Sequence, residues 1–265
     1  MKNLSWKTKL IGGLLLLLPL YFAVAALGTK FGVWGWQFGL GAMIIVAGPI
    51  LLGIVAVVSL VLLVMALLKK PRQGWVLPAI GLVVPLGIFG MLASVGSTAD
   101  KNPIHDVATD TADPPQFSAR TMAAREKSGA NPLLDYQQPL REFEMYKDSP
   151  PEIAIKSHAQ IITDSYATLS PLPLGGASKQ DAVAAVAAAM GSMGFSDIST
   201  DAEAGIVEGV ATSFWFGFKD DVVARISENE IDFRSVSRVG RSDLGANAKR
   251  IAELRGHTSK LIGQR

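Results

Sequence analysis

The stretch DFRSVSRVGRSDLGANAKRI, residues 232–251, decides how the second half of this chain folds. Side chains two positions apart in a β-strand share one face, so a strand here places Asp232, Arg234 and Arg238 on the same face. From Ser242 or Asp243 onward the pattern changes to an amphipathic helix that runs to about residue 261. A strand with a charged face, followed by a terminal helix, is therefore the central unit of the predicted fold.

The residues before this unit predict the rest of the same fold. Four strand-like runs, separated by short turns, read FSDIST, GIVEGVATSFWF, DVVARIS and EIDFRSVSR. Upstream, Ser178 is a good cap for a helix over 179–193, and TLSPLPL suits a short edge strand because proline cannot pair inside a sheet. The order β-α-β-β-β-β-α predicts an α+β fold, with an antiparallel sheet and helices packed on one face in a helix-grip-like arrangement.

The last hairpin can be predicted residue by residue. A two-residue turn at Glu228 and Asn229 places Arg225 opposite Asp232, and it places apolar residues opposite apolar residues. One face of the hairpin is then apolar and suited to pack under helices, while the other carries the charges. A turn over 217–220 brings Glu208 to the same charged face.

Two interpretations of this charged face remain open. Arginine guanidinium groups suit carboxylate or phosphate oxygens, so the face could bind an anionic ligand. Alternatively, residues 97–150 lie over the face, and His105, Asp106 and Asp110 pair with its arginines. In that case the charges hold the fold together.

The first 96 residues predict a membrane anchor. Three uncharged apolar stretches, residues 10–28, 38–68 and 75–96, are long enough to span a bilayer, which takes about 20 helical residues. None contains an ionisable side chain, the usual mark of a transport path. We expect residues 97–150 to form an extended wrapping segment or linker, and residues 151–265 to form the α+β domain.

Flanking cations predict the orientation in the membrane. Those that precede the first span or separate the last two are Lys2, Lys7, Lys9, Lys69, Lys70 and Arg72. The positive-inside rule then makes the N-terminus cytoplasmic and the C-terminal domain periplasmic, as in an integral protein of a bacterial inner membrane. Alternatively, the first span is a signal peptide cleaved near residues 23–25, which leaves the domain on the same side.

Composition limits the chemistry. The chain has no cysteine, which excludes thiolate catalysis and cysteine-based metal sites, and its three histidines lack a metal-ligand spacing. A net charge of +2 without a basic run does not indicate a nucleic-acid partner. No cofactor motif occurs in the soluble half. The remaining catalytic alternative is His105 as a general base oriented by Asp106.

The motifs NPIHDVATDTADPPQF and DFRSVSRVGRSDLGANAKRI, with the strand-rich stretch between them, resemble the bacterial and plastid family called domain of unknown function 1499. The resemblance covers residues 100–263. It implies that the His-Asp motif and the arginine motif belong together, and it implies no reaction. Together with the charged-face argument, it points to a ligand-binding or structural polar network of Asp110, Arg225, Asp232, Arg234, Ser235, Ser237, Arg238, Asp243, Asn247 and Arg250.

The sequence thus predicts a membrane-anchored envelope protein whose periplasmic domain is a binding or assembly module. Its expected partners are the lipid bilayer and either an anionic envelope ligand or an envelope protein. Two alternatives remain: an envelope hydrolase that uses His105 beside an arginine-lined anion site, and a membrane-complex subunit whose domain docks a partner. No feature of the sequence requires an enzyme.

Overall fold

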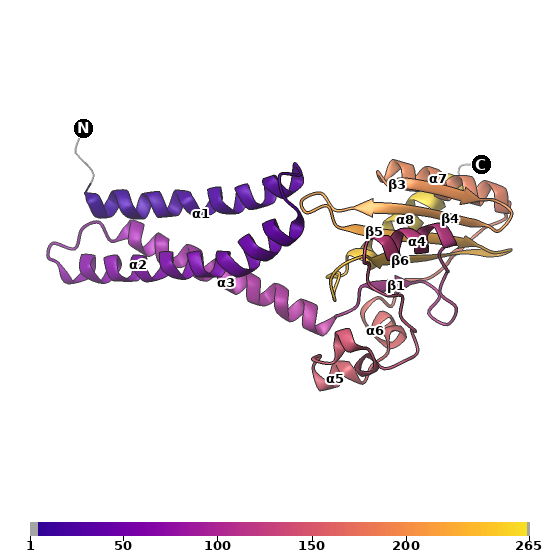
Figure 1. The fold of residues 1–265 in the computed structure, drawn as a ribbon, viewed down its shortest axis with the longest axis horizontal. Helices are drawn as coiled ribbons and strands as arrows, with labels where there is room; N and C mark the ends of the chain where they lie inside the picture. Colours follow the sequence, from indigo (N-terminus) through magenta and orange to yellow (C-terminus); the bar gives the residue numbers. More distant parts are fainter. Residues whose placement is uncertain (1–4, 264–265) are drawn as a thin grey trace. The chain divides into compact units, whose positions relative to one another are not determined.

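The computed structural model describes residues 5–263, so Lys2 of the predicted cytoplasmic cluster lies outside the described residues. The chain divides into two compact units (Figure 1). One comprises Met1–Gly96 with Phe214–Gly217, and the other comprises Ser97–Ser213 with Phe218–Arg265.

The first unit is built from apolar helices. They are α1 (Trp6–Lys30), the π-helix η1 (Gln37–Ala47), which continues directly into α2 (Gly48–Leu68), and α3 (Val76–Lys101). The three helical runs, with η1 and α2 taken as one, are long and apolar enough to cross a membrane. This confirms that three long apolar helices precede the second unit, as expected of a membrane protein.

Small residues let these helices approach one another closely. A side chain at Gly81 would meet the Ser59 hydroxyl at 2.5 Å, and one at Gly48 would meet the Phe22 ring at 3.0 Å. Beside these contacts, Leu18 and Leu52 are buried in an apolar cluster. In a lipid environment such van der Waals packing, rather than the hydrophobic effect, holds helices together.

The second unit contains short helices around one sheet. Its elements are β1 (Asp106–Ala108), α4 (Ala119–Lys127), the 3-10 turns η2 (Leu140–Glu142) and η3 (Glu144–Tyr146), α5 (Pro151–Ala154), α6 (His158–Ser165), β2 (Leu172–Pro173), α7 (Lys179–Ser192), β3 (Ser196–Asp201), β4 (Ile206–Thr212), β5 (Lys219–Ile226), β6 (Glu230–Ser237) and α8 (Ala246–Gly263). Residues 97–150 are therefore not uniformly extended, because they contain the last turn of α3, one strand and one regular helix.

The sheet is antiparallel throughout, in the order β1-β6-β5-β4-β3, with β2 also paired to β6. The predicted turn at Glu228 and Asn229 is confirmed, and Arg225 lies opposite Asp232. The turn between β4 and β5 was predicted three residues too late, since Ser213 and Phe218 already close it. Moving the turn by three residues changes the pairing partners on β5 by an even number of positions. Glu208 therefore still lies on the same face as Arg225, as predicted.

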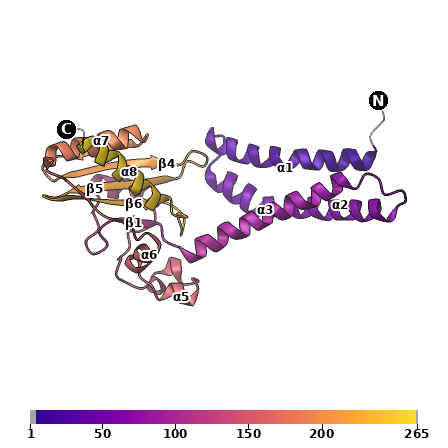
Figure 2. The same cartoon turned by 180° about the vertical axis from the view of Figure 1, so that it is seen from behind.

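Helices α7 and α8 cover one face of the sheet, and α4 lies on the other (Figures 1 and 2). Between the sheet and the two long helices, Phe233, Met190 and Ile251 are fully buried in the main apolar core. Ser178 caps α7 by accepting a hydrogen bond from the Asp181 amide, as predicted. The α+β fold class is confirmed, and α4 is an addition that the sequence argument missed.

The core predicts a large difference between two apolar truncations. Phe233→Ala should lower the free energy of unfolding of the C-terminal unit by about 3–5 kcal/mol, because the cavity it leaves cannot collapse. Ile155→Ala, at a residue that is 61% exposed, should change it by less than about 0.5 kcal/mol. Denaturant unfolding of the full chain in detergent, followed by near-UV circular dichroism, measures both. Equal effects would contradict the assigned core.

Candidate functional site

Charged side chains line the sheet face that is turned away from α7 and α8, which we call the charged face. They include Glu208, Asp221, Arg225, Asp232, Arg234 and Arg238. Residues from the segment 106–131 lie against this face and meet almost every one of these charges. The details decide whether the face is free to bind a ligand.

The most deeply buried contact joins Asp106 of β1 to Arg234 of β6. The guanidinium donates from Nε and Nη2 to the two carboxylate oxygens, at 3.0 and 2.7 Å, and both side chains are at most 2% exposed. The Tyr136 hydroxyl also donates to Asp106, and Arg234 Nη1 donates to the Pro115 carbonyl at 3.2 Å. The guanidinium lies 5.2 Å from the Tyr136 ring centroid. Every strong polar group here has a partner.

This pairing decides the ionisation of Asp106. Burial alone raises the pKa of a carboxyl group, but the charge and the hydrogen bonds of Arg234, assisted by Tyr136, outweigh it. The pKa of Asp106 therefore lies below its ordinary value, and the pKa of Arg234 is raised although its burial acts to lower it. The pair is charged on both sides, inside the protein.

Asp221 is the centre of a second buried cluster. It accepts from Arg125 of α4 at 2.6 Å and from Arg238 through Nε and Nη2 at 3.0 and 2.7 Å. Arg125 is 3% exposed and also donates to the Asn131 carbonyl at 2.7 Å. The carboxylate of Asp221 thus fixes α4 and the segment after it to the sheet.

Arg225 forms a third cluster nearer the solvent. It pairs with Asp110 at 3.2 Å, with Asp113 at 2.6 Å and with its cross-strand neighbour Asp232 at 3.1 Å. Its pKa is raised, because the hydrogen bonds and charges of Asp232 and Asp113 outweigh its partial burial. The three carboxylates leave Arg225 little capacity for an added anion.

The remaining predicted site residues lie on the opposite face, under α8. Ser235 donates to Asn247 at 2.6 Å, and Asn247 donates to Ser237 and to the His105 carbonyl at 3.0 and 2.9 Å. Arg250 reaches Ser235 at 2.9 Å and Asp220 at 2.6 Å. This network fixes α8 across β6 and β1, and Ser235 and Asn247 at its centre are fully buried.

Asp243 begins α8. Its carboxylate accepts from the Gly245 and Asn247 amides at 2.7 and 2.8 Å, which satisfies amides that a helix start leaves unpaired. Burial raises the pKa of Asp243. The amide of Asp243 donates to the Ile104 carbonyl at 3.1 Å, so the same residue also holds the chain that enters β1.

His105 does not meet an arginine and does not face solvent. Its side chain is fully buried, with Nδ1 3.0 Å from the Tyr146 hydroxyl. The ring of His158 lies edge-on to it with centroids 6.5 Å apart. Burial lowers the pKa of His105 and lowers that of His158 to about 4, so both rings are neutral at pH 7. An inaccessible neutral histidine argues against its use as a general base on an external substrate.

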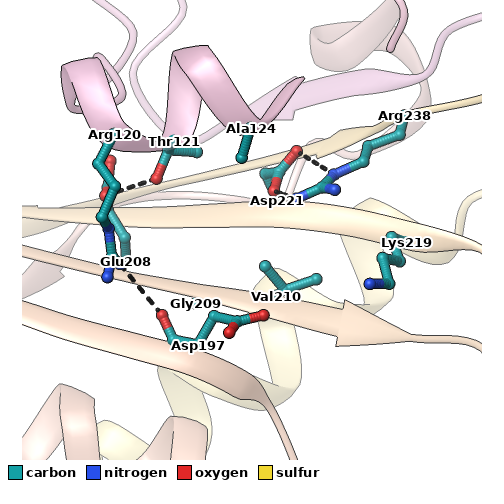
Figure 3. Close-up of a pocket in the computed structure, with 10 residues that line it drawn as sticks. All are labelled: Arg120, Thr121, Ala124, Asp197, Glu208, Gly209, Val210, Lys219, Asp221 and Arg238. Atoms are coloured by element: carbon teal, nitrogen blue, oxygen red, sulfur yellow. Dashed lines mark hydrogen bonds and ion pairs between the residues drawn. The ribbon is translucent and has the colours of Figure 1, made fainter. Parts of the chain in front are cut away.

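One part of the charged face stays open. A cleft of about 360 Å³ lies between α4 and strands β3–β5 (Figure 3). Its floor includes Glu208, which accepts from the Ser118 amide at 2.5 Å, the Ser118 hydroxyl at 2.6 Å and the Thr121 hydroxyl at 2.7 Å. The carboxylate therefore fixes the start of α4, while the cleft beside it remains accessible.

Two cations at opposite ends of the cleft lack a carboxylate partner (Figure 3). Arg120 donates to the carbonyl of Asp197 at 3.3 Å and to the Ser199 hydroxyl at 2.6 Å, both neutral acceptors. Among residues 5–263, no carboxylate lies within ion-pair distance of the Lys219 ammonium group. Within the cleft, these two residues, and not the predicted Arg225, Arg234 and Arg238, are the cations that remain available. Within the same described residues, no group of three His, Asp or Glu side chains could hold a metal ion.

The sequence argument missed Arg125, Arg120 and the helix that carries them. A signal was present, because Ser118 is a good helix cap and the run ARTMAAREK consists of helix-forming residues. The surrounding prolines and the polar composition concealed it. Tyr146, which contacts His105, and Tyr136, which contacts Asp106, come from segments far away in the chain. No sequence pattern predicts these contacts.

Comparison with known proteins identifies one family. The family model described as "Protein of unknown function (DUF1499)" matches residues 106–257, which is more than half of the chain. The protein therefore belongs to this family, and its match lies on the C-terminal side of the three apolar helices. No curated protein and no solved structure gives a significant match.

The buried pair predicts a strongly asymmetric response to mutation. Arg234→Met leaves the Asp106 carboxylate buried without a counter-charge and should lower the free energy of unfolding by about 3–5 kcal/mol. Adding Asp106→Leu should recover part of that loss, because no uncompensated charge remains. Lys147→Met, which breaks an exposed ion pair with Glu144, should cost less than about 1 kcal/mol. Denaturant unfolding measures all three variants. A double variant less stable than Arg234→Met would show that the unpaired Asp106 charge does not cause the loss of stability.

The buried histidines predict a loss of stability in mild acid. A histidine whose pKa is 6.5 when unfolded and about 4 when folded binds more protons in the unfolded state between these values. Stability should therefore fall as the pH drops from about 6.5 toward about 4, by about 3 kcal/mol for His158, with His105 acting in the same direction. His158→Phe should flatten this part of the profile. The lowered pKa of Asp106 adds a separate loss only as the pH falls through and below about 3.8. A wild-type stability that is constant from pH 6.5 to 4 would refute the assignment.

Proposed function

We propose that this family member is a membrane-anchored envelope protein whose extracytoplasmic α+β domain binds an anionic group of an envelope ligand in the cleft between α4 and β3–β5. The spans carry no ionisable side chain, which favours an anchor over a transport path. The cations before the first span and in the loop 69–72 favour a cytoplasmic N-terminus, and therefore a periplasmic domain at a bacterial inner membrane.

The observation that carries the proposal is the unequal use of positive charge. Arg225, Arg234, Arg238 and Arg125 are all neutralised by carboxylates of the domain itself. Arg120 and Lys219 are not, and they lie at the two ends of one cleft. A guanidinium and an ammonium group that line the same open cleft suit the oxygens of a phosphate or a carboxylate.

The cleft also limits the charge of its ligand. Asp197, on the β3 side, contributes a carboxylate whose Oδ2 accepts only from the neighbouring Ser196 hydroxyl at 3.2 Å. A group with several negative charges would be repelled by it. A single phosphate or carboxylate with an amine or hydroxyl groups nearby satisfies both the cations and Asp197.

This assignment supports a binding module over the hydrolase alternative. A hydrolase that uses His105 needs that ring beside the substrate, but the ring is fully buried against Tyr146 and His158. The cleft itself contains no histidine and no serine paired with a base. The arginines that such an enzyme would use to stabilise developing charge are already neutralised.

Native mass spectrometry of the full-length protein, extracted from membranes in mild detergent, tests the proposal. The wild type should retain an anionic lipid, glycan or metabolite as an added mass. Lys219→Ala or Arg120→Ala should reduce its occupancy about tenfold, because one charge-assisted hydrogen bond contributes about 1.5–3 kcal/mol. Lys260→Ala, an exposed lysine of α8 outside the cleft, is the matched control. An added mass retained equally by all four proteins, or no added mass in the wild type, would contradict a ligand site here.

A further inference from the structure

The loop between β4 and β5 exposes aromatic side chains at its tip. The run from Thr212 to Phe218 reads TSFWFGF and carries no charge. Phe214 is 70% exposed and Trp215 is 49% exposed, and their rings meet edge-on with centroids 4.9 Å apart. Large aromatic groups at the tip of a polar domain are usual at sites that contact a protein or a membrane.

The register of the sheet shows which end of the domain carries this tip. One row of paired residues runs Asp106, Val236, Asp221 and Val210 across β1, β6, β5 and β4. Beyond this row in one direction, β4 and β5 continue to the aromatic tip. In the same direction from Asp106, the chain leads back to Lys101, the last residue of α3. The register alone therefore makes β4 and β5 lead to the tip at the same end of the sheet from which the chain leads back to the membrane tether.

The tip and the chain between Asp106 and Lys101 extend similar distances from the sheet. From Asp221 to Phe218, where the tip begins, three strand residues extend about 10 Å. From Asp106 back to Lys101, five residues extend at most about 17 Å. The lateral separation of β1 and β5 is two strand spacings, about 10 Å. A membrane surface close to the end of α3 is thus within reach of the tip.

We propose that Phe214 and Trp215 insert into the interfacial layer of the same bilayer that the chain's own helices span. Tryptophan and phenylalanine suit this layer, because their rings bury in the acyl boundary while the indole N–H stays near the headgroups. The tether keeps the tip at a high local concentration near the membrane, so two aromatic side chains suffice for a reversible contact. The proposal does not depend on the ligand of the cleft.

Depth-dependent quenching of Trp215 tests this contact in the full-length chain. Trp215 becomes the sole tryptophan when four others are replaced: Trp6→Phe, Trp34→Phe, Trp36→Phe and Trp75→Phe. The protein is reconstituted into vesicles of phosphatidylcholine and phosphatidylglycerol, with or without bromine on the acyl chains. In the matched control, Trp215→Phe and Glu228→Trp move the single tryptophan to the β5–β6 turn at the opposite end of the sheet.

Insertion predicts that brominated lipid removes most of the Trp215 emission and leaves that of the tryptophan at 228 unchanged. Iodide, present on both sides of the vesicle membrane, should quench only the control. Emission from Trp215 that iodide quenches and bromine does not would overturn the proposal. Protection of Trp215 from both quenchers would also overturn it, by showing that protein covers the tip. Quenching of both tryptophans by bromine would contradict contact through the tip alone, because both ends of the sheet would then reach the bilayer.

A second measurement keeps the test independent of the four replacements. Because the chain contains no cysteine, a nitroxide on Phe214→Cys reports depth in an otherwise native protein. Insertion predicts that this label collides more with dissolved oxygen than with a polar nickel complex, whereas a label on Glu228→Cys shows the reverse. Equal behaviour of the two labels would exclude insertion.

Discussion

The buried ion pair between Asp106 and Arg234 is the constraint on which the rest of the domain depends. Moving either charge alone from water into the interior is strongly unfavourable, so each must be matched by an opposite charge and by further hydrogen bonds. The two residues are 128 positions apart, and their contact closes β1 onto β6. Tyr136 and the Pro115 carbonyl complete the pair; Pro115 belongs to the segment 106–131 that lies against the charged face, and Tyr136 follows it in the chain. Satisfying one buried guanidinium thus fixes the path of a long irregular segment.

The same requirement explains how the charges of the face are distributed. Asp221 holds two arginines from different elements, and Arg225 holds three carboxylates. Glu208 has no cation but accepts three hydrogen bonds from the start of α4. These groups join the segment 106–131 to the sheet by polar contacts, whereas α7 and α8 pack on the other face through the apolar core. Among the residues that line the cleft, Arg120 and Lys219 are the cations for which the described residues supply no carboxylate partner.

Sequence reasoning succeeded where a local pattern decides the geometry. The two-residue turn at Glu228 fixes the pairing of β5 with β6, and the alternation of side chains then fixes which face is charged. The fold class and the three spans follow from hydrophobic periodicity and length. The β4–β5 turn was misplaced because SFWF has the composition of a buried strand, although its aromatic side chains lie at an exposed tip. The rule that large apolar residues are buried fails there for a chain that works beside a membrane.

The candidate site was less predictable, because it depends on contacts between distant segments. Neither motif alone shows whether Arg234 binds a ligand or Asp106. His105 was a candidate general base only while its neighbours Tyr146 and His158 were unknown. The cleft is formed by α4, β3, β4 and β5, of which α4 was not predicted at all. The family resemblance correctly joined the two end motifs, since residues 105–113 and 225–250 meet in several hydrogen bonds and ion pairs.

Amide hydrogen exchange on the full-length protein tests most directly the claim that the segment 106–131, which lies against the charged face, is part of the folded core. The Thr109 amide donates to the Phe233 carbonyl, and the Asn131 amide donates to that of Arg238. If buried ion pairs fix this segment, both amides should exchange as slowly as that of Val223 in the central strand β5, through the same global opening. Fast exchange at Thr109 and Asn131 beside a protected Val223 would show that the segment opens alone, and would contradict the account.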